Sequence, residues 1–129
     1  MECTVIVVTH GKLANELIAT SNMLIGRQDN VITVEFMPGE NLEGLIKKLA
    51  GIVATITADS AILIVVDMYS GSPFNASSYF VKHRPDTRVI AGVNIPMLVN
   101  LLLERQDAQS LDDLVTLAVN VGRNAVKPL

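Results

Sequence analysis

Two kinds of segment alternate along the chain. Four short runs are almost continuously apolar and rich in β-branched residues, which is typical of strands buried on both faces of a sheet. Longer segments between them repeat apolar residues every three or four positions, which predicts amphipathic helices. The four expected strands are Cys3–Thr9, Val31–Phe36, Ala61–Val66 and Arg88–Val93.

Start and stop signals mark the ends of the expected helices. Gly26 is a stop signal, and Asn41 and Ser110 are residue types that cap helix N-termini. Ser72 and Asn94 also resemble caps, because a proline that suits the first turn of a helix follows each of them closely. The expected helices are Lys12–Ile25, Leu42–Ala58, Ser72–His83, Asn94–Glu104 and Ser110–Arg123.

The order of these elements predicts an α/β fold. Strands that alternate with helices form an open, mostly parallel sheet, here of four strands with helices on both faces. With 129 residues and no linker or repeat, we expect a single domain spanning 1–129. Ligands of such sheets bind beyond the carboxyl ends of the strands, so the residues at those ends are the candidates for function.

Half of the residues are hydrophobic, so a membrane protein has to be considered. The apolar window Leu49–Val66 contains Asp59, and a charged residue at mid-membrane costs about 2.5–3.5 kcal/mol. A second window, Val89–Leu103, contains Pro96 and is shorter than the roughly twenty residues that a spanning helix needs. We therefore expect no direct membrane insertion, and attribute the apolar excess to buried strands or a subunit interface.

Charge and residue counts exclude further classes. Ten Lys and Arg against thirteen Asp and Glu give a net charge of −3, which argues against a nucleic-acid partner. One cysteine and two histidines allow no internal disulfide and no histidine-rich metal site. We expect Cys3 to be an inert core residue and His83 to lie at a helix end. The start lacks the basic region of a secretory signal, so we expect a cytoplasmic protein.

Two residues that follow expected strands could form one reactive pair. His10 follows the first strand, and its neutral imidazole is a nucleophile and an acid–base group near neutral pH. Asp67 ends the third strand, which in doubly wound sheets commonly lies beside the first. A carboxylate there could hold one ring N–H and leave the other nitrogen free to attack. The alternatives are a capping or core histidine and a solvated or capping aspartate.

The loop from Tyr69 to Asn75 is small and polar and leads into a helix N-terminus. Free backbone N–H groups at such a place can bind a phosphoryl group, although ordinary turn and cap chemistry uses the same residues. Composition and pattern thus predict an α/β protein with a His/Asp phosphoryl or acid–base site. They do not select the reaction.

Four stretches, in order and at matching spacing, resemble one family over most of the chain, to about Gly122-Arg123. They are the IIA components of the mannose family, part of the bacterial phosphoenolpyruvate-dependent sugar phosphotransferase system. The stretches are Val8-Thr9-His10-Gly11, Pro38-Gly39-Glu40-Asn41, the run from Val66 to Ala76, and Ala91-Gly92-Val93-Asn94-Ile95-Pro96-Met97-Leu98.

The resemblance implies a phosphoryl carrier without metal or cofactor. The IIA component accepts a phosphoryl group from the histidine-containing phosphocarrier protein and passes it to a histidine of the IIB component during sugar uptake. His10 matches the histidine that is phosphorylated through Nε2, and Asp67 matches the carboxylate that orients it. The expected phosphoryl-binding residues are Thr9, Gly11, Ser70, Gly71 and Ser72.

Such a site must be shallow, because two histidines from different proteins approach one phosphorus atom. An apolar rim would let partners dock, and methionine suits a surface with two successive partners. The candidates for this rim are Met37, Met68, Tyr69, Phe74 and Met97, each of which could instead be a core residue.

The chain departs from the family pattern in two respects. The family often has two glycines before Ser-Pro, and here the first is replaced by Ser70, which costs about 1 kcal/mol if that position needs a positive φ. The family forms homodimers that exchange a C-terminal strand. Only the short segment Asn124–Leu129 is available here as such an extra edge strand.

Two other functions remain open from the sequence. The phosphoryl-transfer subunit of dihydroxyacetone kinase resembles the same fold and histidine. A non-catalytic module that reports its own phosphorylation state would also need His10. The sugar is not indicated, because a IIA component never touches it.

Overall fold

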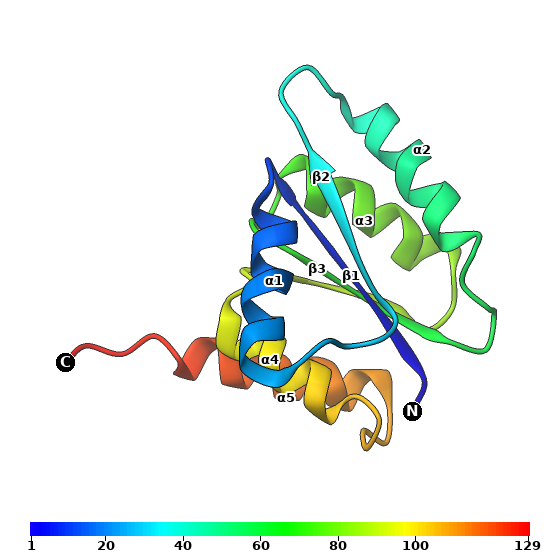
Figure 1. Ribbon diagram of the computed structural model, residues 1–129. Coiled ribbons are helices and arrows are strands. Elements are labelled where there is room, and N and C mark those ends of the chain that lie inside the picture. Colours follow the sequence, from blue (N-terminus) through cyan, green and yellow to red (C-terminus); the bar gives the residue numbers. More distant parts are fainter.

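The computed structural model describes all 129 residues as a parallel sheet between two layers of helices (Figure 1). The strands are β1 (Cys3–His10), β2 (Val31–Phe36), β3 (Ala61–Val66) and β4 (Thr87–Ala91). The helices are α1 (Leu13–Ile25), α2 (Leu42–Val53), α3 (Ser72–His83), α4 (Ile95–Glu104) and α5 (Leu111–Asn124). The α/β fold with an open four-stranded sheet is therefore confirmed.

The strand order is β2-β1-β3-β4, and every neighbouring pair is parallel. Because β1 and β3 are the two central strands, their carboxyl ends lie side by side, with Val8 of β1 paired with Val66 of β3. On the other side of β1, His10 is paired with Phe36 of β2. The order thus makes the carboxyl ends of β2, β1 and β3 neighbours at one edge of the sheet.

Alternation along β1 divides the interior into two cores. Val5 and Val7 belong to the core under α1, α4 and α5, whereas Ile6 and Val8 belong to the core under α2 and α3. All four valine and isoleucine side chains are fully buried, and burying one such side chain contributes about 1.5–3 kcal/mol. The central strands are apolar on both faces because helices cover both.

Two predicted elements have different bounds in the structure. α2 ends at Val53 rather than Ala58, because Thr55 and Ile56 donate their N–H groups to the carbonyls of Ile52 and Val53 and so tighten the chain into turns. β4 spans Thr87–Ala91 rather than Arg88–Val93. It stops because Gly92, at φ +87°, leaves the extended conformation.

Smaller differences concern caps and the C-terminus. α1 begins one residue later than predicted, and Gly71 rather than Ser72 is the N-cap of α3. Asn94 and Ser110 cap α4 and α5 as predicted, each accepting a backbone N–H three residues on. Residues 126–129 form no strand in this chain and extend away from its body (Figure 1).

Two features, the burial of Cys3 and the length of the helices, bear on earlier expectations. Cys3 is buried in the core under α1, α4 and α5, and this burial raises the pKa of its thiol, with Arg105 opposing the shift. The thiol is therefore protonated and shielded. No helix is long and apolar enough to span a bilayer.

Candidate functional site

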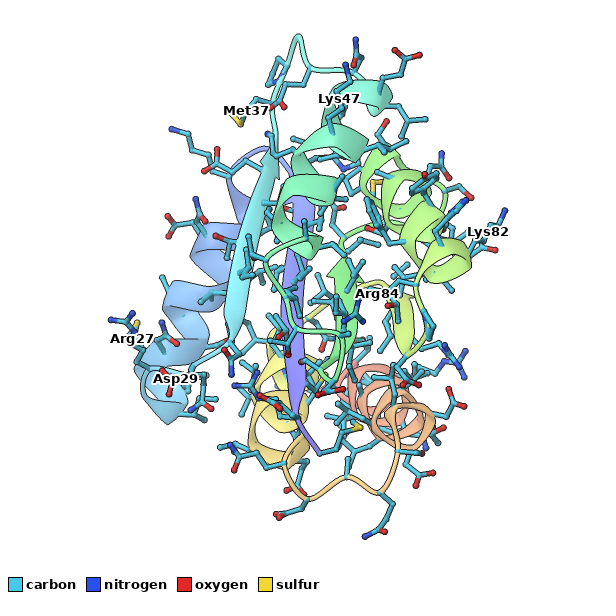
Figure 2. The ribbon with its side chains drawn as sticks, turned by 90° about the vertical axis from the view of Figure 1, so that its right-hand side faces the viewer. Arg27, Asp29, Met37, Lys47, Lys82 and Arg84 are labelled. Atoms are coloured by element: carbon cyan, nitrogen blue, oxygen red, sulfur yellow. The ribbon has the colours of Figure 1, made fainter.

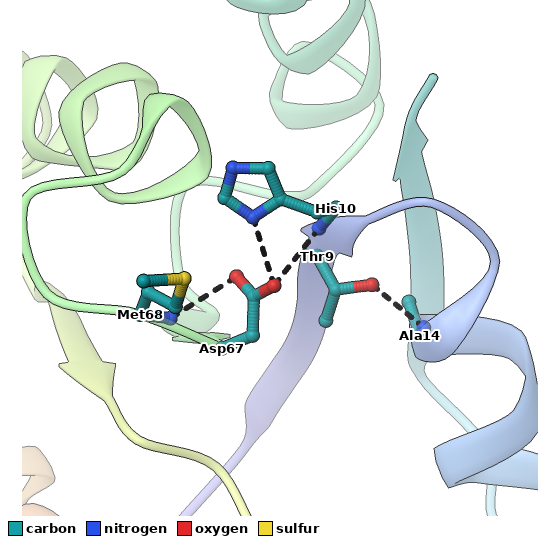
Figure 3. A network of polar contacts seen from close by, with 5 residues as sticks. All are labelled: Thr9, His10, Ala14, Asp67 and Met68. Carbon is teal, nitrogen blue, oxygen red and sulfur yellow. Dashed lines mark hydrogen bonds and ion pairs between the residues drawn. The ribbon is translucent and has the colours of Figure 1, made fainter. Parts of the chain in front are cut away.

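His10 and Asp67 meet where β1 and β3 end (Figure 3). Oδ2 of Asp67 accepts a hydrogen bond from the backbone N–H of His10 at 3.1 Å and lies 2.9 Å from Nδ1 of the imidazole. The other carboxylate oxygen accepts the N–H of Met68 at 3.1 Å. The carboxylate is thus fixed by backbone groups on both sides and in turn fixes the ring.

This arrangement determines which ring nitrogen is available. An ionised carboxylate can only accept, so Nδ1 carries the proton and Nε2 of a neutral ring keeps its lone pair. The histidine side chain is 44% exposed, whereas that of the aspartate is 13% exposed. Nε2 makes no hydrogen bond, and Figure 3 shows it on the side of the ring away from Asp67. An exposed nucleophilic nitrogen therefore stands above a half-enclosed carboxylate.

The loop before α3 borders the imidazole. Gly71 lies so close that a Cβ atom on it would be 2.9 Å from Cε1 of His10. Its φ is −78°, so the small side chain is needed here for space and not for backbone freedom. The residue before it, Ser70, has φ +66°, a left-handed backbone conformation that favours glycine. Ser70 therefore has the positive φ at which a serine backbone is expected to be strained.

The N-terminus of α3 opens toward this loop. Its N-cap, Gly71, offers no side chain to bond the first N–H groups of the helix, and Pro73 follows at the second helical position. An uncapped helix N-terminus is a place of positive potential that suits an anion. Ser72 stands at the first helical position, so it adjoins this end of α3.

Thr9 lies on the other face of the sheet from the imidazole. Its side chain is fully buried, and Oγ1 accepts the N–H of Ala14 at 2.7 Å, which caps α1 from the end of β1 (Figure 3). The prediction that Thr9 contacts a phosphoryl group therefore does not fit its placement. Because side chains alternate along β1, that of Thr9 points toward α1 and that of His10 points toward α2 and α3.

Gly11 forms the turn that follows His10. It has φ +59°, and its N–H donates to the carbonyl of Phe36 at 2.8 Å. The turn is thereby fastened to the end of β2. Of the five expected phosphoryl-binding residues, Gly11, Ser70, Gly71 and Ser72 lie beside His10 or at the start of α3, whereas the side chain of Thr9 points to the opposite face of the sheet.

The expected docking residues separate into exposed and buried members. Met68 and Tyr69 are exposed by 59% and 75%, and the Tyr69 ring rests on Phe74 with centroids 4.6 Å apart. Met37 is half-buried and lies beyond the end of β2 (Figure 2). Met97 is 3% exposed and packs against Gly122. It is therefore a core residue, the alternative given above, and is not part of an exposed docking rim.

Sequence reasoning missed one neighbour of the histidine. The Phe36 ring lies 5.9 Å from the His10 ring, centroid to centroid, with the two planes at 80°. Phe36 is the last residue of an ordinary apolar strand, so only the pairing of β1 with β2 identifies it. The second histidine, His83, lies in the last turn of α3, stacked on Tyr79 with its Nδ1 2.7 Å from the Tyr79 carbonyl.

No group of three or more His, Cys, Asp or Glu side chains lies close enough to hold a metal ion. The clearest ion pair elsewhere at this end of the molecule joins Glu40 to Lys48, with Oε2 and Nζ 2.8 Å apart. The Lys48 hydrogen bond, followed by the Met37 N–H, lowers the pKa of the Glu40 carboxyl.

A model of the PTS system fructose IIA component family, of the mannose type, matches residues 4–119, which include the whole of this site. The chain belongs to the mannose family of phosphotransferase-system IIA components. The expected family resemblance is thus confirmed.

Named relatives agree with this assignment. The chain is 46% identical over its whole length to the mannose-specific EIIAB component of Escherichia coli, of which it spans 40%. It is 36% identical over 105 residues to the sorbose-specific EIIA component of Klebsiella pneumoniae, covering 81% of this chain and 76% of that relative. The chain thus spans less than half of the EIIAB relative but most of the separate EIIA component.

A solved structure shares the fold closely. The mannose/sorbose-specific IIA subunit from Enterococcus faecalis superposes with a TM-score of 0.92 at 26% identity. The match covers all of this chain and 96% of that one. The arrangement of strands and helices described above is therefore that of a IIA subunit.

Proposed function

We propose that this IIA component is a phosphoryl carrier, in which Nε2 of His10 accepts a phosphoryl group from the histidine-containing phosphocarrier protein. It then passes the group to a histidine of the IIB component during sugar uptake through the membrane components. The observation behind this proposal is the bond between Asp67 and Nδ1, which leaves Nε2 unprotonated and exposed. We propose further that residues 1–129 act as one phosphocarrier domain in the cytoplasm.

The chemistry follows from the ring's protonation. The Nε2 lone pair forms a bond to phosphorus while the bond from phosphorus to the donor's histidine nitrogen breaks. Nδ1 keeps its proton, so positive charge spreads over the ring as the new bond forms. The Asp67 carboxylate, 2.9 Å from Nδ1, stabilises that charge. Transfer to the IIB component is the same displacement with the acceptor histidine as nucleophile.

The phosphoryl oxygens require positive potential and room. The uncapped start of α3 supplies the potential, and the missing side chain of Gly71 supplies the room beside the ring. Gly11, Ser70 and Ser72 complete the proposed surroundings of the phosphoryl group. Phosphoryl transfer depends mainly on such positioning and charge stabilisation, and in this proposal no metal or cofactor takes part.

We also propose that the chain is a homodimer joined at the β4 edge. An apolar groove of about 530 Å³ runs along β4 between α3 and α5 and is bordered by Val126 of the same chain. In this proposal the exposed residues 127–129 that follow reach the groove of a second copy. The opposite edge is less open, because Lys48 Nζ bonds the carbonyl of Glu35 on β2 at 3.0 Å. Dimers would be expected in light scattering, and deletion of residues 125–129 would weaken them.

The test of the carrier role measures mass after incubation with phosphoenolpyruvate, enzyme I and the phosphocarrier protein. Wild type should gain one acid-labile phosphoryl group and His10→Ala none. His83→Ala, the variant in the only other histidine, should gain it normally. Retention of the gain in His10→Ala would overturn the proposal.

Onward transfer separates the remaining alternatives. Release of the group to a purified IIB component supports the carrier role. Transfer to a subunit with bound adenine nucleotide would instead indicate the dihydroxyacetone kinase type, and phosphorylation without onward transfer would indicate a reporting module. The sugar names of the relatives favour the first outcome.

A further inference from the structure

Phe36 stands directly beside His10 in the sheet. The two residues are paired in the parallel register of β2 with β1, and paired residues of neighbouring strands present their side chains on the same face. That face is the one covered by α2 and α3, where Phe36 packs at the margin of the core. The half-buried phenyl ring is thus held by packing from below while one side of it meets the imidazole.

Phe36 contacts the reactive turn twice. Its ring meets the His10 ring almost at right angles, with centroids 5.9 Å apart. Its carbonyl accepts the N–H of Gly11 at 2.8 Å, which fixes the backbone directly after the histidine. One residue of β2 therefore restrains both the side chain and the main chain of the residue that bears Nε2.

The imidazole is restrained on three sides. Asp67 holds Nδ1, the Gly71 backbone lies against Cε1, and the Phe36 ring stands at the third side. A hydrogen bond to Nδ1 alone leaves the ring free to tilt about that bond. A neighbouring aromatic ring at right angles opposes such tilting, because edge-to-face contacts are favourable at this separation.

We infer that Phe36 is a positioning residue that fixes the direction of the His10 Nε2 lone pair for in-line phosphoryl transfer. This inference rests on the proposed carrier function. It gives Phe36 no contact with the donor protein, so its loss affects the rate within the complex and not the assembly of the complex.

The test compares three variants. Phe36→Leu removes the ring but keeps apolar bulk, Phe36→Tyr keeps the ring, and Phe80→Leu removes a buried phenylalanine of α3 from the same core, away from His10. Phosphorylation rates are measured over a range of phosphocarrier-protein concentrations, together with thermal unfolding. ¹⁵N spectra of the His10 imidazole report its tautomer without any donor.

We expect Phe36→Leu to lower the saturated rate about tenfold, since small misplacements of a reacting atom have effects of this order or larger. The half-saturating donor concentration should stay unchanged, and Phe36→Tyr should restore the rate. In the spectra, Phe36→Leu should shift the single Nδ1–H tautomer toward a mixture. Phe80→Leu should lower thermal stability alone.

Other results overturn the inference. An equal loss of rate in Phe80→Leu would mean that core stability is responsible, and a raised half-saturating concentration would make Phe36 a docking residue. If wild type accepts no phosphoryl group, the carrier proposal fails. The imidazole spectra then still decide whether Phe36 orients the ring.

Discussion

One oxygen of Asp67, Oδ2, accepts a hydrogen bond from the backbone N–H of His10 and also lies within hydrogen-bond distance of Nδ1 of the same residue. The backbone contact fixes where the carboxylate stands, and the ring contact fixes which nitrogen is protonated. Position and tautomer of the histidine are thus set by the same atom. The other oxygen is held by the Met68 N–H, so the carboxylate itself has little freedom.

Replacing Asp67 by asparagine should slow phosphorylation of His10 about 10- to 100-fold, the usual effect of losing a partner that orients a functional histidine. The carboxamide carries no charge to stabilise the ring as phosphorus binds. The measurement is the initial rate of mass gain. Asp86→Asn, which changes a distant exposed carboxylate, serves as the control, and equal rates in both variants would contradict the role of Asp67.

Adding a methyl group at Gly71 should impair the reaction without unfolding the protein. Its Cβ would come within 2.9 Å of His10 Cε1, so the imidazole must move away from its position over Asp67. We expect Gly71→Ala to lose most of the phosphorylation rate. Gly51→Ala, in an exposed part of α2 with open space around the new Cβ, should keep the full rate. A fully active Gly71→Ala would show that the imidazole tolerates displacement.

Ser70→Gly should stabilise the protein by up to about 1 kcal/mol, because a non-glycine residue at φ +66° is strained. Urea unfolding measures this difference in the free energy of unfolding. Ala19→Gly, on the exposed face of α1, should act in the opposite direction. A destabilised Ser70→Gly variant would mean that the serine hydroxyl compensates for the strain.

Thr9→Val should lower the free energy of unfolding by about 1 kcal/mol, the usual effect of losing a helix cap. Valine fills the same volume but offers nothing to the N–H of Ala14. Thr9→Ser, which keeps the acceptor, should retain more of the stability. A large loss of phosphorylation rate at unchanged stability would instead restore Thr9 as a phosphoryl-binding residue.

Stability should depend on Glu40 at acid pH. Because the pKa of its carboxyl is lowered below 4.5 in the folded protein, ionised Glu40 favours folding above that value. The contribution disappears as pH falls through the folded pKa. Glu40→Gln should therefore flatten the pH dependence of unfolding below pH 4.5, as followed by unfolding at a series of acid pH values.

The elements and their order could be predicted because the sheet is buried on both faces. Short, continuous apolar runs rich in β-branched residues, such as Ala61–Val66, are typical of strands buried on both faces, and the alternation with helices then sets the layers. The end of α2 could not be predicted from the apolar pattern, because Ile56 continues the helical spacing of α2 although it packs onto the core from a turn. Side-chain spacing does not reveal where the backbone changes its hydrogen-bond pattern.

A site residue could be predicted only where its position in the sequence determines its location in the fold. His10 and Asp67 follow strands that are neighbours in the sheet, so their meeting follows from topology. Thr9 was grouped with His10 because the two are adjacent in sequence, although a strand turns adjacent residues to opposite faces. Phe36 was overlooked because its importance depends on the register between two strands, which no local pattern contains.

Because side chains alternate between the two faces along β1, an insertion or deletion in this strand has a different effect when it comprises an odd number of residues than when it comprises an even number. An insertion or deletion of one residue between Val5 and His10 would exchange the two faces, burying the imidazole beneath α1 and turning the threonine toward α3. A change of two residues would preserve the faces and only shift the histidine along the sheet. Evolutionary changes in this strand should therefore come as substitutions or as pairs of residues, and single-residue gaps should be absent from functional descendants.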